Sequence, residues 1–228
     1  MNSETNSIPN VEVKSAGSKR NPFKIITGYI ELPGWDGYFL SEPTIYSKEE
    51  KRVTGGRVGL QVDGGIKPDG SMDFSKEQVA AYWYLVENKE AVKKAILEGL
   101  VCYFPYLLSN DYEYYDQEEG GFPPPSAIIP GFDFKDYIGP TSVSIEEHEK
   151  EDAAYTTWHF NCRWDPEHGF QVSMHKDRII DIGQERDIYK IFKDNGTYEQ
   201  EIAAYQPTNN PPPFVWKKKK LWQFWKEQ

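Results

Sequence analysis

The sequence has few of the features that mark secreted or membrane-spanning proteins. Only two cysteines, Cys102 and Cys162, occur among 228 residues, and both fall on apolar faces of predicted elements. Since small secreted domains are usually rich in disulfides, this pair predicts two free, buried thiols in a reducing compartment. No apolar run approaches the ~20 residues that a transmembrane helix needs, and the polar segment 1–20 lacks the apolar stretch of a signal peptide. These absences predict a soluble, cytoplasmic protein.

The chain has no net positive charge outside the C-terminal segment. The net charge is −10, and residues 217–228 alone hold five lysines against one glutamate. The remainder of the chain is therefore more acidic than the total suggests. Because nucleic-acid phosphates are bound by basic patches, this distribution argues against a nucleic-acid partner. It favours attraction to a basic protein or another cation.

Complete catalytic and metal-binding motifs are also missing. Asp69-Gly-Ser71-Met-Asp73 begins like a calcium loop, but Phe74 replaces the turn glycine and Ala80 replaces the bidentate glutamate. The chain contains no Gly-x-Ser-x-Gly elbow, no phosphate-binding loop and no Cys-x-x-Cys pair. The sequence therefore predicts no metal and no cofactor, and it favours a binding module over an enzyme.

The composition predicts three segments along the chain. Residues 1–22 are polar and aperiodic, as in a flexible leader. Residues 23–205 carry the periodic segments of one α+β domain, whose core should be rich in aromatic residues because these make up 15% of the chain. Residues 206–228 form a proline-rich linker followed by a basic, aromatic tail.

The order of the predicted elements defines the fold class. Alternation and turn residues predict strands at 24–32, 35–40, 57–62 and 141–145, with Pro33-Gly34 marking a hairpin turn between the first two. Ser75 and Gln78 form a capping box that begins a helix, and a second helix runs from Asn88 towards Pro105. A long surface loop is expected at 109–140, with short helices at 185–193 and 198–205. We expect an α+β fold in which an antiparallel sheet with a C-terminal β-meander is covered on one face by a helical hairpin.

The most readable segment is the meander at 155–183. Trp158, Phe160, Cys162 and Trp164 alternate with polar residues, and the same period resumes at Phe170, Val172 and Met174. Matching the apolar faces predicts a hairpin that pairs Trp164 with Phe170, Cys162 with Val172 and Phe160 with Met174. The connection would be residues 165–169, in which Asp165, Pro166 and Gly169 have turn-forming roles.

A third strand is predicted at 179–183. A three-residue turn at 176–178 would place Ile180 and Ile182 on the core face and Asp181 beside Ser173 on the polar face. A two-residue turn is also possible and would exchange the two faces.

The polar face of this meander offers candidate catalytic residues. His159, His175 and Asp181 could form a metal or acid–base cluster, because cross-strand neighbours lie ~5 Å apart. Asp165 or Glu167 could assist them in a hydrolase. Cys162 points to the opposite side and cannot take part. An exposed sheet face with three such side chains is more often without function, so we keep this hydrolase as an alternative.

Acidic segments are the predicted surface for a partner. They are the 111–119 part of the long loop, the run from Glu146 to Asp152, and the tip of the meander hairpin. The predicted partner-binding residues are Asp111, Glu113, Asp116, Glu118, Glu119, Glu167 and His168.

The tail suggests a further alternative. It combines Trp216, Trp222 and Trp225 with the four lysines 217–220, a composition found in membrane-surface anchors. It could equally dock on the domain itself or on a partner.

The segment from Phe160 to Gly183 resembles the closing motif of an uncharacterised family of bacterial cytosolic proteins. That motif is a Trp-Asp-x-Glu-His-Gly turn, an apolar strand, a turn such as His-Lys and a short strand ending in glycine, matched here by Trp164 to Gly169 and by His175-Lys176. Residues 84–88 and 94–97 resemble its helical part. The resemblance implies an immunity-like or other protein-binding role, and it carries no catalytic residues. The acidic body of the protein is compatible with neutralisation of a basic toxin by electrostatic complementarity.

Overall fold

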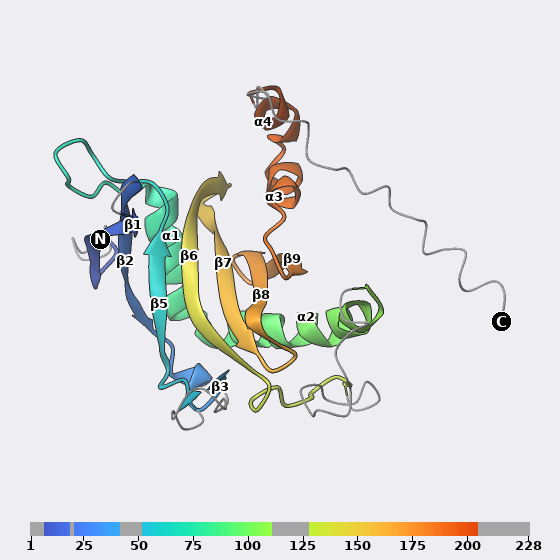
Figure 1. The fold of residues 1–228 in the computed structure, drawn as a ribbon. Helices are drawn as coiled ribbons and strands as arrows, with labels where there is room; N and C mark the ends of the chain where they lie inside the picture. The colour runs from blue at the N-terminus through green and yellow to red at the C-terminus, as the bar shows by residue number, and fades with distance from the viewer. Residues whose placement is uncertain (1–6, 19–20, 42–51, 111–127, 205–228) are drawn as a thin grey trace.

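A seven-stranded sheet forms the body of the protein. The structure, a computed structural model, describes residues 7–18, 21–41, 52–110 and 128–204 (Figure 1). The strand order is β1-β2-β5-β6-β7-β8-β9, and every neighbouring pair is antiparallel except β5 and β6. Parallel neighbours need a crossover connection, and α1 and α2 lie in the segment that joins these two strands. The strands are β1 (Val11–Ser18), β2 (Asn21–Glu31), β5 (Arg57–Val62), β6 (Ile138–Lys150), β7 (Ala153–Cys162), β8 (Asp165–His175) and β9 (Arg178–Gly183).

The N-terminal part differs from the sequence prediction. Residues 11–18, which we placed in a flexible leader, form β1 and pair with β2. Val11 and Val13 of this edge strand pack against the core. Their alternation with polar residues is short, so the sequence did not identify this segment as a strand. No hairpin forms at Pro33-Gly34, because Pro33–Trp35 is a 3-10 helix that buries Trp35. Strand β3 (Phe39–Ser41) instead pairs with β4 (Arg52–Val53) in a separate small sheet.

Two consecutive helices pack behind the sheet. Helix α1 (Lys76–Glu87) begins at the predicted capping box, with Ser75 and Gln78 bonded reciprocally. Helix α2 (Lys89–Asn110) starts two residues later and continues past Pro105. In Figure 1, α1 follows the strands and α2 runs across the lower part of the sheet, so a helical hairpin is not confirmed. Cys102 lies on the exposed side of α2, contrary to the prediction, whereas Cys162 is buried and both thiols are free.

The β7–β8 hairpin is present, but its predicted register was wrong by four residues. Phe160 pairs with Phe170 and Trp158 with Val172. The turn is Arg163–Trp164, and residues 165–169, including Pro166, belong to an irregular start of β8. A shift of four residues preserves which side chains share a face. The shorter turn also lets Trp164 enter the core, where it lies 5.4 Å from Phe104 and 5.6 Å from Phe170 between ring centroids.

The β8–β9 turn combines both alternatives considered from the sequence. It has two residues, because His175 pairs with Arg178, and Lys176 has a positive φ of 58°. A register shift then makes Ile180 an extra residue and restores the pairing of Ser173 with Asp181. The core face of β9 is therefore formed by Ile179 and Ile182, not by Ile180 and Ile182.

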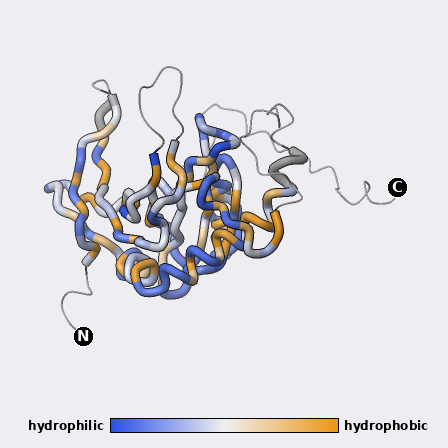
Figure 2. The backbone as a smooth tube through the Cα atoms, turned by 90° about the horizontal axis from the view of Figure 1, so that it is seen from below, coloured by the Kyte–Doolittle hydropathy of each residue, from blue (hydrophilic) through white to orange (hydrophobic). Residues whose placement is uncertain are grey.

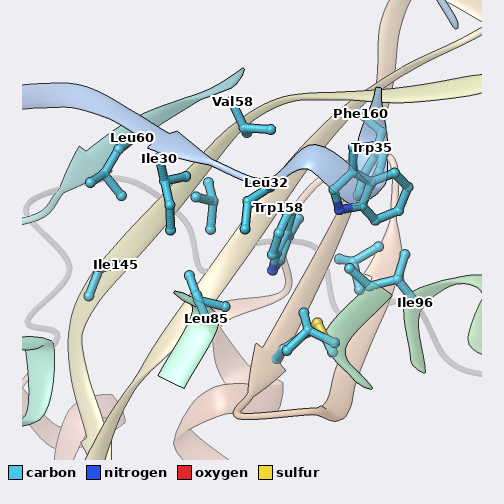
Figure 3. Packing of buried hydrophobic residues seen from close by; sticks show 14 of the residues in the cluster. Ile30, Leu32, Trp35, Val58, Leu60, Leu85, Ile96, Ile145, Trp158 and Phe160 are labelled. Atoms are coloured by element: carbon cyan, nitrogen blue, oxygen red, sulfur yellow. The ribbon is translucent and has the colours of Figure 1, made fainter. Parts of the chain in front are cut away.

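The hydrophobic core lies between the sheet and helices α1 and α2. Figure 3 shows Trp35, Trp158 and Phe160 gathered near Leu85 of α1 and Ile96 of α2. The Trp35 ring centroid lies 5.5 Å from that of Phe160 and 6.2 Å from that of Trp158. Along the tube in Figure 2 the colour changes repeatedly between hydrophobic and hydrophilic, as alternating strands require.

Helices α3 (Ile188–Asn195) and α4 (Tyr198–Ala204) follow β9, close to the predicted positions. Helix α3 packs against β6 and β9. In the part of the chain that the structure describes, no helix combines the length and apolar character that crossing a bilayer requires.

Candidate functional site

The sheet face opposite α1 and α2 is polar across four adjacent strands. Side chains that alternate with the core residues project there: Gln61 of β5, Ser144 and Glu146 of β6, Thr157 and His159 of β7, and Gln171 and Ser173 of β8. Several of them are buried, although the sequence predicted a solvent-exposed face. One part of this face is covered by α3, and the other opens into a cavity.

Asp194 at the end of α3 anchors the covered part. Its carboxylate accepts hydrogen bonds from Arg178 Nη1 and Nη2, each at 2.7 Å, and from Tyr155 Oη at 2.7 Å. Lys150 Nζ lies 3.3 Å away. Donation from Arg178 holds the pKa of Asp194 well below its usual range, while burial and the Asp194 carboxylate raise the pKa of Tyr155.

His175 and Asp181, two of the three candidate catalytic residues of the hydrolase alternative, also have structural partners. His175 Nε2 donates to the Lys150 carbonyl at 2.9 Å, and its ring packs against Tyr155. Asp181 accepts from Lys190 and from the Asp187 amide at 3.1 Å, which ties down the start of α3. Neither lines the cavity, so the predicted cluster with His159 is not assembled.

The open part is a cavity of about 450 Å³ with Glu146 as its most buried acid. The Glu146 side chain is 2% exposed, its Oε1 accepts from Thr157 Oγ1 at 2.6 Å, and its Oε2 accepts from Arg186. Burial raises the pKa of Glu146, while the Thr157 and Arg186 hydrogen bonds oppose that rise. The cavity is lined by Gln61, Asp63, Ser144, Glu146, Thr157, His159, Gln171, Glu185 and Arg186.

Of the three candidate catalytic residues, His159 lines this cavity and the other two do not. Burial lowers the pKa of His159, and the nearby Arg186 charge acts in the same direction. The imidazole is therefore neutral at pH 7. Its Nε2 lies 3.5 Å from Ser144 Oγ, which is at the limit of a hydrogen bond.

The cavity is electronegative. Asp63 Oδ1 accepts from Gln61 Nε2 at 3.1 Å, and among the described residues neither Asp63 nor Glu185 forms an ion pair. Arg186 is already bonded to Glu146, and His159 is uncharged, so two carboxylates are left without a balancing cation. This arrangement suits a cationic group. Within the described ranges, no three or more His, Cys, Asp and Glu side chains are placed to hold a metal ion together.

Sequence reasoning missed most of this cavity. Glu146 was assigned to an acidic loop, but β6 continues to Lys150 and turns Glu146 inward. The alternation of Ser144 and Glu146 with Val143 and Ile145 could have revealed that Glu146 lies on the polar side of a strand. No local signal marks Arg186, because it meets Glu146 from 40 residues away in sequence.

The hairpin residues are placed as follows. Asp165 is 1% exposed, and its carboxylate accepts from the His168 amide at 3.0 Å, from His168 Nδ1 at 3.1 Å and from Gln184 Nε2 at 2.7 Å. Glu167 and His168 are exposed beside it, and Gly169 has the positive φ expected of it. The predicted partner-binding acids at 111–119 and the tail lie outside the described residues.

Comparison with known proteins identifies a family. Residues 40–189 match the model of a domain of unknown function, DUF6985, and this segment contains the whole cavity and the Trp-Asp-x-Glu-His-Gly motif. Searches of curated proteins and of solved structures give no significant match. The matched segment covers more than half of the sequence and agrees with the expected uncharacterised family. The chain belongs to the DUF6985 family.

Proposed function

We propose that this protein is a non-enzymatic binding module of the bacterial cytoplasm that binds a basic protein partner. The observation that carries the proposal is the electronegative cavity on the polar sheet face, where Asp63 and Glu185 lie near the ion pair of buried Glu146 with partly exposed Arg186. A basic toxin is a partner of the right charge, which would make the protein immunity-like.

The surroundings of the cavity support electrostatic recognition. The β6–β7 hairpin exposes Glu147, Glu149, Glu151 and Asp152 at one end of the same strands. Together with a net charge of −10, these acids create a field that speeds association with a basic protein. Exposed Glu167 and His168 on β8, with acids of the 111–119 segment, would extend the contact.

Partner capture with charge-matched variants tests the proposal. Tagged wild-type protein, an Asp63→Asn/Glu185→Gln variant and a control Glu87→Gln/Glu199→Gln variant would be incubated with lysate of the native host at low and high salt. The control removes the same charge at exposed positions outside the cavity. We expect a basic protein that the wild type and the control retain at low salt, and that the cavity variant binds about tenfold more weakly. Equal retention by all three proteins at both salt concentrations would contradict the proposal.

A hydrolase remains the second candidate, because the cavity brings a carboxyl group of raised pKa and a neutral imidazole onto one surface. Wild type and His159→Gln would be assayed on chromogenic ester, phosphoester and glycoside substrates. Turnover that His159→Gln abolishes would favour the enzyme.

A third candidate is membrane anchoring by Trp216, Trp222, Trp225 and lysines 217–220. Liposome sedimentation with and without residues 214–228 tests it.

A further inference from the structure

The floor of the cavity already holds a guanidinium group. Arg186 Nη1 donates to the Glu146 carboxylate, and Thr157 Oγ1 donates to the other carboxylate oxygen. Thr157 Oγ1 in turn lies 3.3 Å from Ser173 Oγ. The sheet thus provides a fixed carboxylate whose orientation is set by a buried hydroxyl. A planar guanidinium with several donors is well matched to such an acceptor.

The two partners are unequally embedded. The Glu146 side chain is 2% exposed and projects from the central strand β6, whereas the Arg186 side chain is 34% exposed. Arg186 comes from the short segment between β9 and α3, outside both elements. The carboxylate is therefore held in place by the sheet. Arg186 binds it from the solvent side of the cavity, which is the side from which a ligand would bind.

The remaining groups of the cavity select the class of ligand. An anion would find no available positive charge, since Arg186 is paired and His159 is neutral. Asp63 and Glu185 add negative charge, and Gln61 and Gln171 add side-chain amide oxygens that can accept hydrogen bonds. A volume of about 450 Å³ falls within the range of ordinary ligand pockets.

We propose that this cavity is an arginine-recognition site: in the free protein Arg186 occupies the Glu146 carboxylate, and in the complex an arginine side chain of the partner takes its place. The displaced Arg186 moves into solvent, where its charge is hydrated. That the incoming arginine belongs to a partner protein rests on the proposed function. The guanidinium site itself does not depend on that function.

Chemical rescue of a vacated site tests the inference. Arg186→Ala removes the internal guanidinium and leaves Glu146 buried without its ion-pair partner, so the melting temperature should fall. N-acetyl-arginine amide at several times its dissociation constant should then raise the melting temperature by about 2–4 °C. N-acetyl-lysine amide and NaCl at the same ionic strength should have little effect. In the Glu146→Gln/Arg186→Ala variant the arginine probe should have no effect either.

Several results would overturn the arginine site. These are no rescue, equal rescue by the lysine probe, and rescue that persists without the Glu146 carboxylate. If Arg186→Ala does not fold, Arg186→Gln takes its place, and NMR titration of the wild type with the same probe provides a second measurement. Shifts should then centre on His159 and Gln171, and shifts confined to other surfaces would contradict the inference. Rescue by free arginine but not by the capped probe would assign the site to a small molecule and overturn the protein-borne arginine.

The two proposals fail separately. If rescue is absent while capture of a basic protein still depends on Asp63 and Glu185, the arginine site is wrong and the binding function stands. If the arginine probe rescues Arg186→Ala but no basic protein is retained, the site stands and the proposed function is wrong.

Discussion

At the residue scale, the role of an acidic side chain near the polar sheet face is indicated by the groups that it contacts. Asp181 and Asp194 bind basic side chains and hold α3 against the sheet. Glu146, which projects from β6 on the polar sheet face, is bonded to Arg186 at the floor of an open cavity. Asp181 and Asp194 therefore hold α3 in place, whereas Glu146 is the acid at which we propose that a ligand replaces Arg186.

Asp194→Asn should destabilise the protein by about 2 kcal/mol at pH 7, because charge-assisted hydrogen bonds from Arg178 and Tyr155 are lost. Asp152→Asn is the control: its side chain is 75% exposed, against 18% for Asp194, so solvent screens its bond to Lys176 and the substitution should destabilise the protein far less than Asp194→Asn. Urea denaturation measures both.

The pH dependence of Asp194 has a defined sign. Its pKa is lower in the folded than in the unfolded protein, so its stabilisation is complete above the unfolded pKa of about 3.9 and is lost as the pH falls towards the folded value. The difference between wild type and Asp194→Asn should therefore shrink in acid. A difference that stays constant down to pH 3 would contradict the assignment of Arg178 and Tyr155 as the source.

At the element scale, the β7–β8 hairpin depends on a close backbone approach. Cys162 pairs with Asp165 and Phe160 pairs with Phe170, so the four residues 166–169 of β8 lie opposite the single residue Asn161. Gly169 is the last of these four, and regular pairing resumes at Phe170. Gly169 has φ of 67°, and a Cβ there would lie 2.0 Å from the Phe160 carbonyl oxygen. Only glycine satisfies both constraints.

Gly169→Ala should cost about 3 kcal/mol or more, because a left-handed backbone penalty of about 1–2 kcal/mol adds to a steric clash that requires movement of the strand. Gly131→Ala has the same penalty at φ of 89° but no atom within 4 Å of its Cβ, so it should cost only about 1 kcal/mol. Thermal and urea unfolding of the two variants give the comparison. Equal costs would show that β8 adjusts freely at this point.

At the scale of the whole molecule, the folding unit is larger than the family match. The matched segment 40–189 omits β1 and β2, although β2 pairs with β5 and supplies core residues. Ile26, Ile30, Leu32 and Trp35 are each at most 2% exposed. Burial of one such side chain contributes about 2 kcal/mol, and together they approach the whole net stability of a domain, about 5–15 kcal/mol.

A chain reduced to residues 40–189 should therefore not unfold cooperatively. A chain of residues 7–204 should retain a sharp thermal transition close to that of the full-length protein, since it keeps every described element. Circular dichroism during heating distinguishes the two. A cooperative transition for 40–189 would mean that β2 is dispensable to the core.

Local patterns in the sequence determined the α+β class, the strand at 57–62, the capping box at Ser75, and the sides of the sheet to which Trp158, Phe160 and His159 project. These follow from the two-residue period of a strand and from hydrogen bonds within one turn of a helix, which depend only on near neighbours. Tertiary structure decided the register of β7 and β8, the outward position of Cys102, and the pairing of residues 11–18 with β2. It also created the cavity, because Glu146 and Arg186 are brought together by sheet packing that no local pattern encodes.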